Sequence, residues 1–427
     1  MGGLPARGAR RLIRSAGAAG PGRATRLIRV TGVVATVLAT LAAVQVALAL
    51  PVGYDLEAYR LAAQHLRQGV PLYPGPSDTL GRAGEFRYLP LVAVAFLPLT
   101  ALPVEVARWI WSTALFVLAL VLGRGGTRAL PWAVRPWAIA GLVFFLPVVL
   151  EVALGNLNLV TLAFCVAAWR CRDRAPAAGA LLAVAVGLKL LPLALVLFYV
   201  GARRWRVLGW AAAIGLIGLV IMLALMPDQL ADYVRSSQRL LGDQDWVRPA
   251  IDRPGPEWLA AVFWNAQLPR ILAAAVAVGA LAAGHASRTG GGRATTLHHL
   301  TLATMGYLAP FGFFWTTFLV LALPLLGDVL RRSLAIAAAP LRAVALAVLF
   351  GSWLLMQVQA LHDLVPIFAH LVGTLTLGTL ALVLLAARPG SGVALDGDPD
   401  GAPAAGFRRP STRARTSRPA AHPARSR

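Results

Sequence analysis

The chain has 427 residues, of which 58% are hydrophobic and 14% are charged. One soluble core cannot bury that much apolar surface, so the composition excludes an ordinary soluble domain and is typical of an integral membrane protein. The formal net charge of +22 does not favour nucleic acid as a partner, because much of the excess lies in two arms rich in Gly, Ala, Pro and Ser.

The two basic arms, residues 1–29 and 388–427, flank the apolar region. Their composition predicts disordered cytoplasmic tails, and we expect their arginines to lie against the anionic lipids of the plasma membrane. The apolar run from about Val30 to Leu50 is longer than the hydrophobic part of a secretory signal. A retained first membrane helix with the N-terminus in the cytoplasm follows from that length.

Between these arms, residues 30–387 alternate apolar runs with arginine clusters. Because a membrane helix needs about 20 apolar residues and short basic loops stay in the cytoplasm, the pattern predicts an all-α, polytopic membrane domain with about twelve transmembrane segments. Residues 51–87 and 227–268 are expected to be outer loops. The run Leu89–Leu102 is too short for a full span, and the segments that flank Lys189 are typical of half-helices buried in protein.

The sequence carries no pattern for a metal or a nucleotide cofactor. The spacing of Cys165 and Cys171 does not place both thiols on one helix face, so we expect neither a disulfide nor a metal site. No Gly-rich nucleotide loop follows a strand pattern. We therefore predict no cofactor, and any activated donor must arrive in or through the membrane.

Asp55 follows the first apolar run, in the string PVGYDLEAYRLAAQHL, where apolar residues begin to recur at helical spacing. One interpretation is an N-cap, since aspartate favours helix starts and accepts backbone hydrogen bonds there. The other is a general base, because a carboxylate at the water boundary can take a proton from a substrate.

Arg87 and Tyr88, in EFRYLPL, lead from the same loop back into the bilayer. A guanidinium forms paired hydrogen bonds to phosphoryl oxygens without losing its charge, which suits a departing lipid phosphate. Arginine and tyrosine are also common anchors at the membrane interface, and this second interpretation stays open.

Lys189 is the sole lysine of the chain and lies in the apolar string AVAVGLKLLPLALV. An ionisable group at such depth usually faces a cavity, a partner or a substrate, although a side chain that snorkels to the interface is the alternative. Asn156 and Asn158, in EVALGNLNLV, lie at another predicted outer turn. They indicate either hydrogen bonds to sugar hydroxyls or plain turn chemistry after a glycine.

Further polar groups are expected on the outer side. The 227–268 loop combines acidic residues with Trp246, Trp258 and Trp264, a mixture found in carbohydrate sites and also at membrane interfaces. His362 and Asp363 form another outer polar group, whereas His298 and His299 are expected near the inner face without a functional role.

In three ordered strings the chain resembles glycosyltransferase family 87, the polyprenol-phosphate-mannose-dependent α-mannosyltransferases of the GT-C class. YDLEAY with GVPLY is similar to the family's aspartate motif, EFRYLPL to its return into the membrane, and GNLNLV with GLKLLPLAL to its asparagine and lysine-proline motifs. The resemblance covers most of the chain from Ala35 to about Leu330.

The resemblance implies a multi-helix fold with its active site at the outer membrane boundary. Asp55 would be the base that deprotonates an acceptor hydroxyl, while Arg87 and Lys189 would stabilise the leaving lipid phosphate in a single inverting displacement. Partners would be a polyprenyl-phosphate-sugar donor, a glycolipid or glycan acceptor and membrane lipids. The expected substrate-binding side chains are Tyr88, Asn156, Asn158, Trp315 and His362.

One string departs from the family pattern. In LAPFGFFWTTFLVLALP, Trp315 is kept, but Thr316, Thr317 and Phe318 stand where a histidine and a tyrosine are expected. A changed substrate or a catalytically inactive scaffold would account for that difference. A transporter or lipid flippase is the remaining alternative, which we rank lower because no repeat of fixed period is visible and the polar groups gather on one side.

Overall fold

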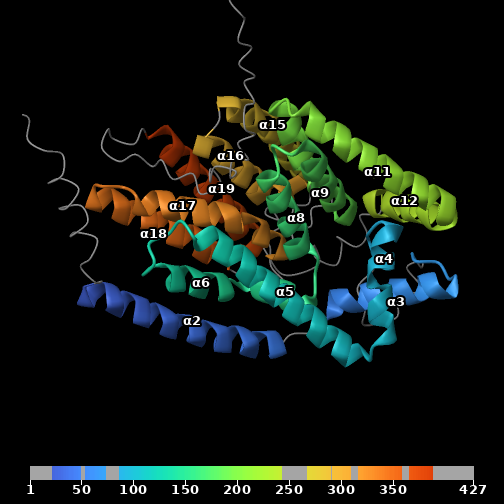
Figure 1. The fold of residues 1–427 in the computed structure, drawn as a ribbon, viewed down its shortest axis with the longest axis horizontal. Helices are drawn as coiled ribbons and strands as arrows, with labels where there is room; N and C mark the ends of the chain where they lie inside the picture. The colour runs from blue at the N-terminus through green and yellow to red at the C-terminus, as the bar shows by residue number, and fades with distance from the viewer. Residues whose placement is uncertain are drawn as a thin grey trace, which may run out of the picture. The chain divides into compact units, whose positions relative to one another are not determined.

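The structure, a computed structural model, describes residues 22–49, 53–73, 86–242, 267–289, 291–308, 316–357 and 365–387 (Figure 1). Most of the predicted N-terminal tail and all of the predicted C-terminal tail therefore lie outside the described residues. Every regular element in the described ranges is a helix, which confirms the predicted all-α class.

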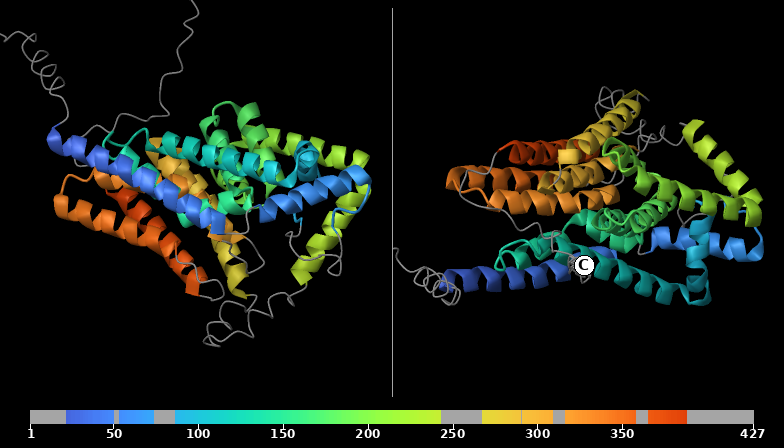
Figure 2. Two further views of the ribbon diagram at one scale, coloured as in Figure 1. Left: turned by 90° about the horizontal axis from the view of Figure 1, so that it is seen from below. Right: turned by 45° about the horizontal axis from the view of Figure 1, so that its top comes forward.

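The first helix of the described residues, α2, runs from Arg23 to Ala49 and so begins inside the predicted tail rather than at about Val30. It packs along α6 (Arg135–Val143), where the Nε1 atom of Trp137 donates to the carbonyl oxygen of Ile28 at 2.9 Å. Figure 2 shows α2 as a separate rod beside this part of the bundle.

Both predicted outer loops contain a helix. Residues of the first form α3 (Tyr54–Gln68), and α12 (Pro227–Gly242) follows the end of α11 (Trp205–Leu225) at an angle visible in Figure 2. The two are linked, because the side-chain oxygen of Gln229 accepts the backbone N–H of Leu72 at 2.9 Å. Helices with one apolar and one polar face are of the kind that lies along a membrane surface.

One short segment and two breaks in the helical path were predicted, and all three are confirmed. The first short segment forms α4 (Pro90–Phe96) and the 3₁₀ helix η1 (Leu97–Ala101), which together are shorter than a full span. Gly155 separates α7 (Leu146–Leu154) from α8 (Asn158–Arg170). Lys189 lies between two short helices, α9 (Ala175–Leu188) and α10 (Leu193–Gly201), and Pro192 precedes the second.

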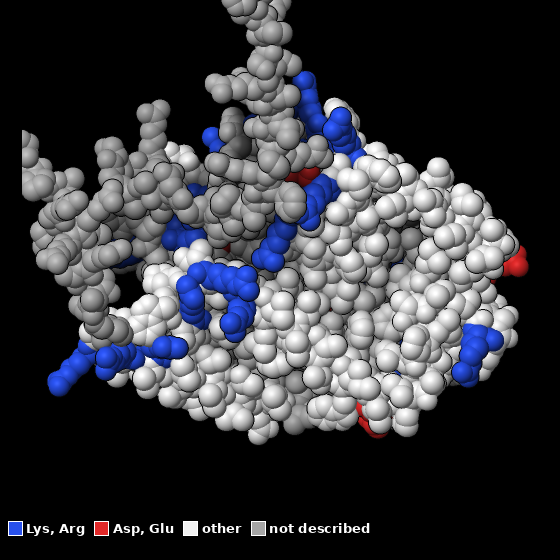
Figure 3. All heavy atoms as spheres, viewed as in Figure 1, with Lys and Arg blue, Asp and Glu red and all other residues white. Residues whose placement is uncertain are grey.

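Four helices are long and apolar enough to cross a membrane, namely Arg23–Ala47 in α2, α5 (Val104–Thr127), α11, and Ala369–Ala386 in α19 (Val365–Ala386). The bent pair of α6 and α7, with 52° between its members, makes a fifth if it forms one span. The described residues thus hold four or five such spans and several shorter apolar helices, fewer full spans than the predicted number. Exposed apolar side chains, including Leu27, Trp109 and Trp205, give these helices lipid-compatible surfaces, and the face in Figure 3 is largely uncharged.

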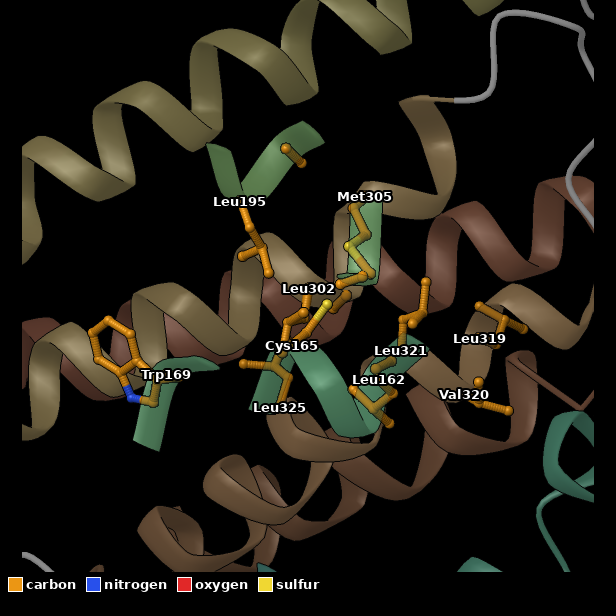
Figure 4. Packing of buried hydrophobic residues seen from close by; sticks show 14 of the residues in the cluster. Leu162, Cys165, Trp169, Leu195, Leu302, Met305, Leu319, Val320, Leu321 and Leu325 are labelled. Carbon is orange, nitrogen blue, oxygen red and sulfur yellow. The ribbon is translucent and has the colours of Figure 1, made fainter. Parts of the chain in front are cut away.

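The largest core lies between α8, α10 and the C-terminal elements. Those are α15 (Gln267–Ala286), α16 (Gly291–Thr304), η3 (Met305–Leu308), η4 (Thr316–Ala322), α17 (Leu323–Leu334), α18 (Ala339–Leu355) and α19. The 3₁₀ helix η2 (Ser287–Thr289) follows α15. Figure 4 shows Cys165 and Leu162 of α8 pointing toward Leu302, Leu321 and Leu325. This core holds α8, α9 and α10 together, and these helices carry or flank Asn158 and Lys189.

The backbones of α10 and α15 approach each other very closely. A Cβ atom on Gly284 would overlap the carbonyl oxygen of Phe198, so only glycine fits there. Small residues at such crossings are typical of helix packing in membranes.

A second core of aromatic and aliphatic side chains supports α3. It includes Leu56, Tyr59, Tyr73, Phe86, Phe96 and Leu157.

Candidate active site

Asp55 stands in the first turn of α3, next to the end of α7. The helix is preceded by Gly53, whose φ of 79° is left-handed and whose N–H donates to the carbonyl oxygen of Ala153 at 2.7 Å. Gly53 is therefore the N-cap, and the N-cap interpretation of Asp55 is wrong. The Asp55 carboxylate instead accepts a hydrogen bond from the Nδ2 atom of Asn156 at 2.7 Å, and the side chain is half-buried.

The turn at Gly155 brings Asn156 and Asn158 to Asp55. Gly155 has a φ of 78°, and a Cβ atom there would lie 3.1 Å from that of Leu56. Its carbonyl oxygen accepts the indole N–H of Trp111 at 2.8 Å. The sharp left-handed turn ends α7, and α8 starts directly after it, with both asparagines near the start of α3.

Lys189 reaches the same place from the break between α9 and α10. Its backbone is extended, with φ −150° and ψ 146°, because the chain leaves α9 there. The Nζ atom donates to the Oδ1 atoms of Asn156 at 2.9 Å and Asn158 at 2.6 Å. Two amide oxygens therefore hold the ammonium inside the protein, which favours a buried polar site over a side chain that snorkels to the interface.

Glu151 is the residue that the sequence reasoning missed. It lies inside α7, is 0% exposed, and accepts hydrogen bonds from the Nδ2 atom of Asn158 at 3.0 Å and from the backbone N–H of Leu159 at 2.9 Å. A glutamate within the apolar string LPVVLEVAL carries the same signal as the lone lysine, since an ionisable group in such a run needs a partner.

These contacts join five side chains into one hydrogen-bonded sequence, Asp55–Asn156–Lys189–Asn158–Glu151. We call it the polar chain. A carboxylate ends it on each side, an ammonium stands at its centre, and one amide lies between each carboxylate and the ammonium. The opposite charges and the hydrogen bonds offset the cost of placing these groups among apolar helices.

Aromatic rings form the walls around the ammonium. The Lys189 Nζ atom lies 5.6 Å from the ring centroid of Tyr88 and 5.1 Å from that of Phe318, within cation–π range. The Tyr88 hydroxyl is 2.9 Å from that of Tyr59, and the Tyr73 hydroxyl donates to the carbonyl oxygen of Tyr88 at 2.5 Å. Tyr88 is thereby fixed beside the polar chain.

The electrostatic setting of Asp55 follows from these neighbours. Burial raises the pKa of Asp55 above its ordinary value, whereas the hydrogen bond from Asn156 and the charges of Lys189 and Arg87 lower it, and the net direction is upward. Arg87 itself is exposed and directly precedes Tyr88 of the aromatic wall. A carboxylate with a raised pKa is a stronger base than an ordinary aspartate, which suits it to accept a proton from a substrate.

Residues 86–310, more than half of the chain, match glycosyltransferase family 87. The chain belongs to this family. The match includes every member of the polar chain except Asp55, which precedes it.

Among curated proteins, this family 87 chain is similar to the polyprenol-phosphate-mannose-dependent α-(1-2)-phosphatidylinositol pentamannoside mannosyltransferase of Mycolicibacterium smegmatis. The two are 29% identical over 169 residues, which is 38% of this chain and 40% of the relative. The chain thus aligns with less than half the length of that relative. No solved structure matches the chain.

The other predicted site residues of the family 87 chain are not all described by the structure, and those that are described differ in burial. Trp315 and His362 lie outside the described residues. Asn158 is 1% exposed and uses both of its side-chain polar atoms within the polar chain, so it braces Lys189 where a contact with a sugar had been expected. Asn156, in contrast, is only half-buried. Phe318, at the position that departs from the family pattern, lies within cation–π distance of the ammonium.

Proposed function

We propose that this family 87 chain is a membrane glycosyltransferase that moves a hexose, specifically mannose, from a polyprenyl-phosphate donor to a glycolipid or glycan acceptor. The polar chain carries the proposal, because it holds a carboxylate of raised pKa within one hydrogen-bonded unit with an ammonium, beside an exposed guanidinium. Family membership and the printed activity of the mycobacterial relative support the donor class.

In the proposed reaction, Asp55 accepts the proton of the acceptor hydroxyl as the hydroxyl oxygen attacks the anomeric carbon. The bond from that carbon to the phosphate oxygen breaks, and its electron pair stays on the leaving lipid phosphate. Lys189 and Arg87 stabilise the added negative charge. Attack opposite the leaving group inverts the configuration at the anomeric carbon, and no covalent enzyme intermediate is needed.

The proposed setting is the extracytoplasmic face of the plasma membrane, with the N-terminus in the cytoplasm. Arginine clusters near Arg174, Arg204 and Arg332 lie at helix ends, and the positive-inside rule favours the cytoplasm for them. The polar chain lies at the opposite ends of α8 and α9. Shorter apolar helices packed between the long spans would complete a membrane domain of about twelve segments.

Purified protein in nanodiscs, given polyprenyl-phosphate-mannose and a panel of glycolipid acceptors, should form a new mannosidic bond. Asp55→Asn should lower turnover by roughly 100-fold or more, since it removes the base. Asp173→Asn is the matched control, because Asp173 is an exposed aspartate, 78% accessible, between α8 and α9. Full activity of the Asp55→Asn variant would exclude the proposed base, and lipid movement without any glycosidic product would favour a flippase.

A further inference from the structure

Glu151 has no direct part in the proposed reaction, yet it occupies one end of the polar chain. Its side chain is 0% exposed, so it cannot touch a sugar or a phosphate. Its Oε1 atom accepts the N–H of Leu159, one of the first backbone donors of α8, and its Oε2 atom accepts the amide of Asn158. Each carboxylate oxygen therefore has a separate partner.

The polarity of these bonds fixes the direction of Asn158. An ammonium only donates hydrogen bonds, so Asn158 must turn its Oδ1 atom to Lys189, and its NH₂ group is thereby directed at Glu151. The second amide, Asn156, supplies another oxygen to the same ammonium. Amides of the described residues thus direct two of the three N–H bonds of Lys189, and we assign the third to an anionic ligand.

We propose that Glu151 is a positioning residue that holds Lys189 in register for the donor phosphate, acting through the amide of Asn158. The role of Lys189 toward phosphate rests on the proposed function above. The positioning itself rests on the buried bonds among Glu151, Asn158 and Lys189. A carboxylate at this end of the polar chain also supplies a second negative charge near the buried ammonium.

A simpler role for Glu151 would be to cap the start of α8, and the variant Glu151→Gln separates the two roles. Glutamine can still accept the N–H of Leu159 through its Oε1 atom, so a capping role survives. Its Nε2 atom would then face the NH₂ group of Asn158, donor against donor. If Asn158 rotates to relieve that contact, its NH₂ group faces the Lys189 ammonium instead.

The double variant Glu151→Gln with Asn158→Asp reverses the polarity of the pair. The introduced amide donates to the introduced carboxylate, that carboxylate accepts from Lys189, and the net charge equals that of the native protein. The single variant Asn158→Asp places two carboxylates side by side and is expected to lose activity. These variants and the native protein form a double-mutant cycle, in which positioning predicts strong recovery in the double variant.

In the transfer assay, each single variant should lower kcat/KM for the polyprenyl-phosphate donor at least roughly tenfold, with the KM for the acceptor unchanged. The double variant should recover most of that loss, and Asp173→Asn should match the native protein. A Glu151→Gln variant with native kcat/KM would overturn the proposal, and so would a double variant no better than the worse single one.

Acylation of Lys189 gives a second readout that does not depend on activity. Because the chain has no other lysine, the rate of acetylation by acetic anhydride at this position can be followed by peptide mass spectrometry. Glu151→Gln should react faster, since the ammonium loses an aligned acceptor and a nearby negative charge, and the double variant should be slow again.

The two readouts keep the positioning role and the proposed function apart. An unaltered acetylation rate in Glu151→Gln would refute positioning even if no sugar transfer were found. Acetylation rates that follow the expected order, without transfer by the native protein, would refute the proposed function alone.

Discussion

The carboxylate of Asp55 accepts a hydrogen bond from the Nδ2 atom of Asn156 at 2.7 Å, which joins the start of α3 to the turn after α7. The Oδ1 atom of the same amide accepts a hydrogen bond from the Lys189 ammonium. Asn156 therefore influences both the position and the acidity of Asp55, and its removal should change how the rate of transfer depends on pH.

Asn156→Leu should move the acidic limb of the pH profile of kcat/KM to higher pH. Burial already raises the pKa of Asp55, and the hydrogen bond from Asn156 is the largest influence that lowers it. A general base works in its ionised form, so activity is present above its pKa and is lost as the pH falls through it. Removal of the amide raises that pKa further. Gln229→Leu, which removes an amide from α12, is the control. If the acidic limb of the Asn156→Leu profile stayed at the pH of the native protein, the assignment of Asp55 as the base would be wrong.

Lys189→Met should lower kcat/KM for the donor by about 100-fold or more, because the leaving phosphate loses a fixed cation. Binding of the product, a polyprenyl phosphate, should weaken in the same variant, as measured by fluorescence or calorimetry in nanodiscs. Arg206→Met removes an exposed cation from α11 and should have neither effect. If the Lys189→Met protein bound polyprenyl phosphate as tightly as the native protein, Lys189 would not belong to the donor site.

Gly155→Ala should impair both stability and transfer. An alanine in the left-handed conformation costs about 1–2 kcal/mol, and its Cβ atom would press on Leu56 at 3.1 Å and on Trp111. The Tm in detergent and the rate of mannose transfer should both fall. Gly215→Ala adds a methyl group to α11 in open space and should leave both unchanged or raise the Tm slightly.

Gly284→Ala tests the close crossing of α10 and α15. The added Cβ atom would overlap the Phe198 carbonyl oxygen, so the backbones must separate. A loss of stability of roughly 1–3 kcal/mol or more is expected. Gly279→Ala, on the same helix with no atom within 4 Å, is the matched control. Equal Tm values for the two variants would show that the crossing is looser than described.

The sequence was sufficient to predict features that depend on local chemistry. An apolar composition with arginine-rich breaks predicted an all-α membrane protein, and Lys189 in an apolar string predicted a polar site near a helix break. Asp55 and Asn156 were both selected as candidates for the same reason: a polar side chain at the end of an apolar run needs an explanation.

What could not be predicted depends on contacts between distant segments. The N-cap interpretation of Asp55 was decided by Gly53, whose left-handed backbone is not visible in a sequence. Glu151 does carry a sequence signal, an ionisable group within an apolar string, but its partners Asn158 and Lys189 reach it only through the tertiary fold. The number of membrane spans stays a prediction for a related reason, since short helices buried among others do not need the length of a free span.

The gap between α9 and α10 sets a limit on how robust this protein can become. Pro192 has no N–H to offer the carbonyl oxygen of Leu188, so a helix that ran through this position would lack that hydrogen bond and be kinked or broken. A residue that mended the break would add backbone hydrogen bonds and draw the ammonium of Lys189 away from its two amide oxygens. Selection for heat resistance alone would therefore work against catalysis at this position, and the most stable form of the protein would be inactive.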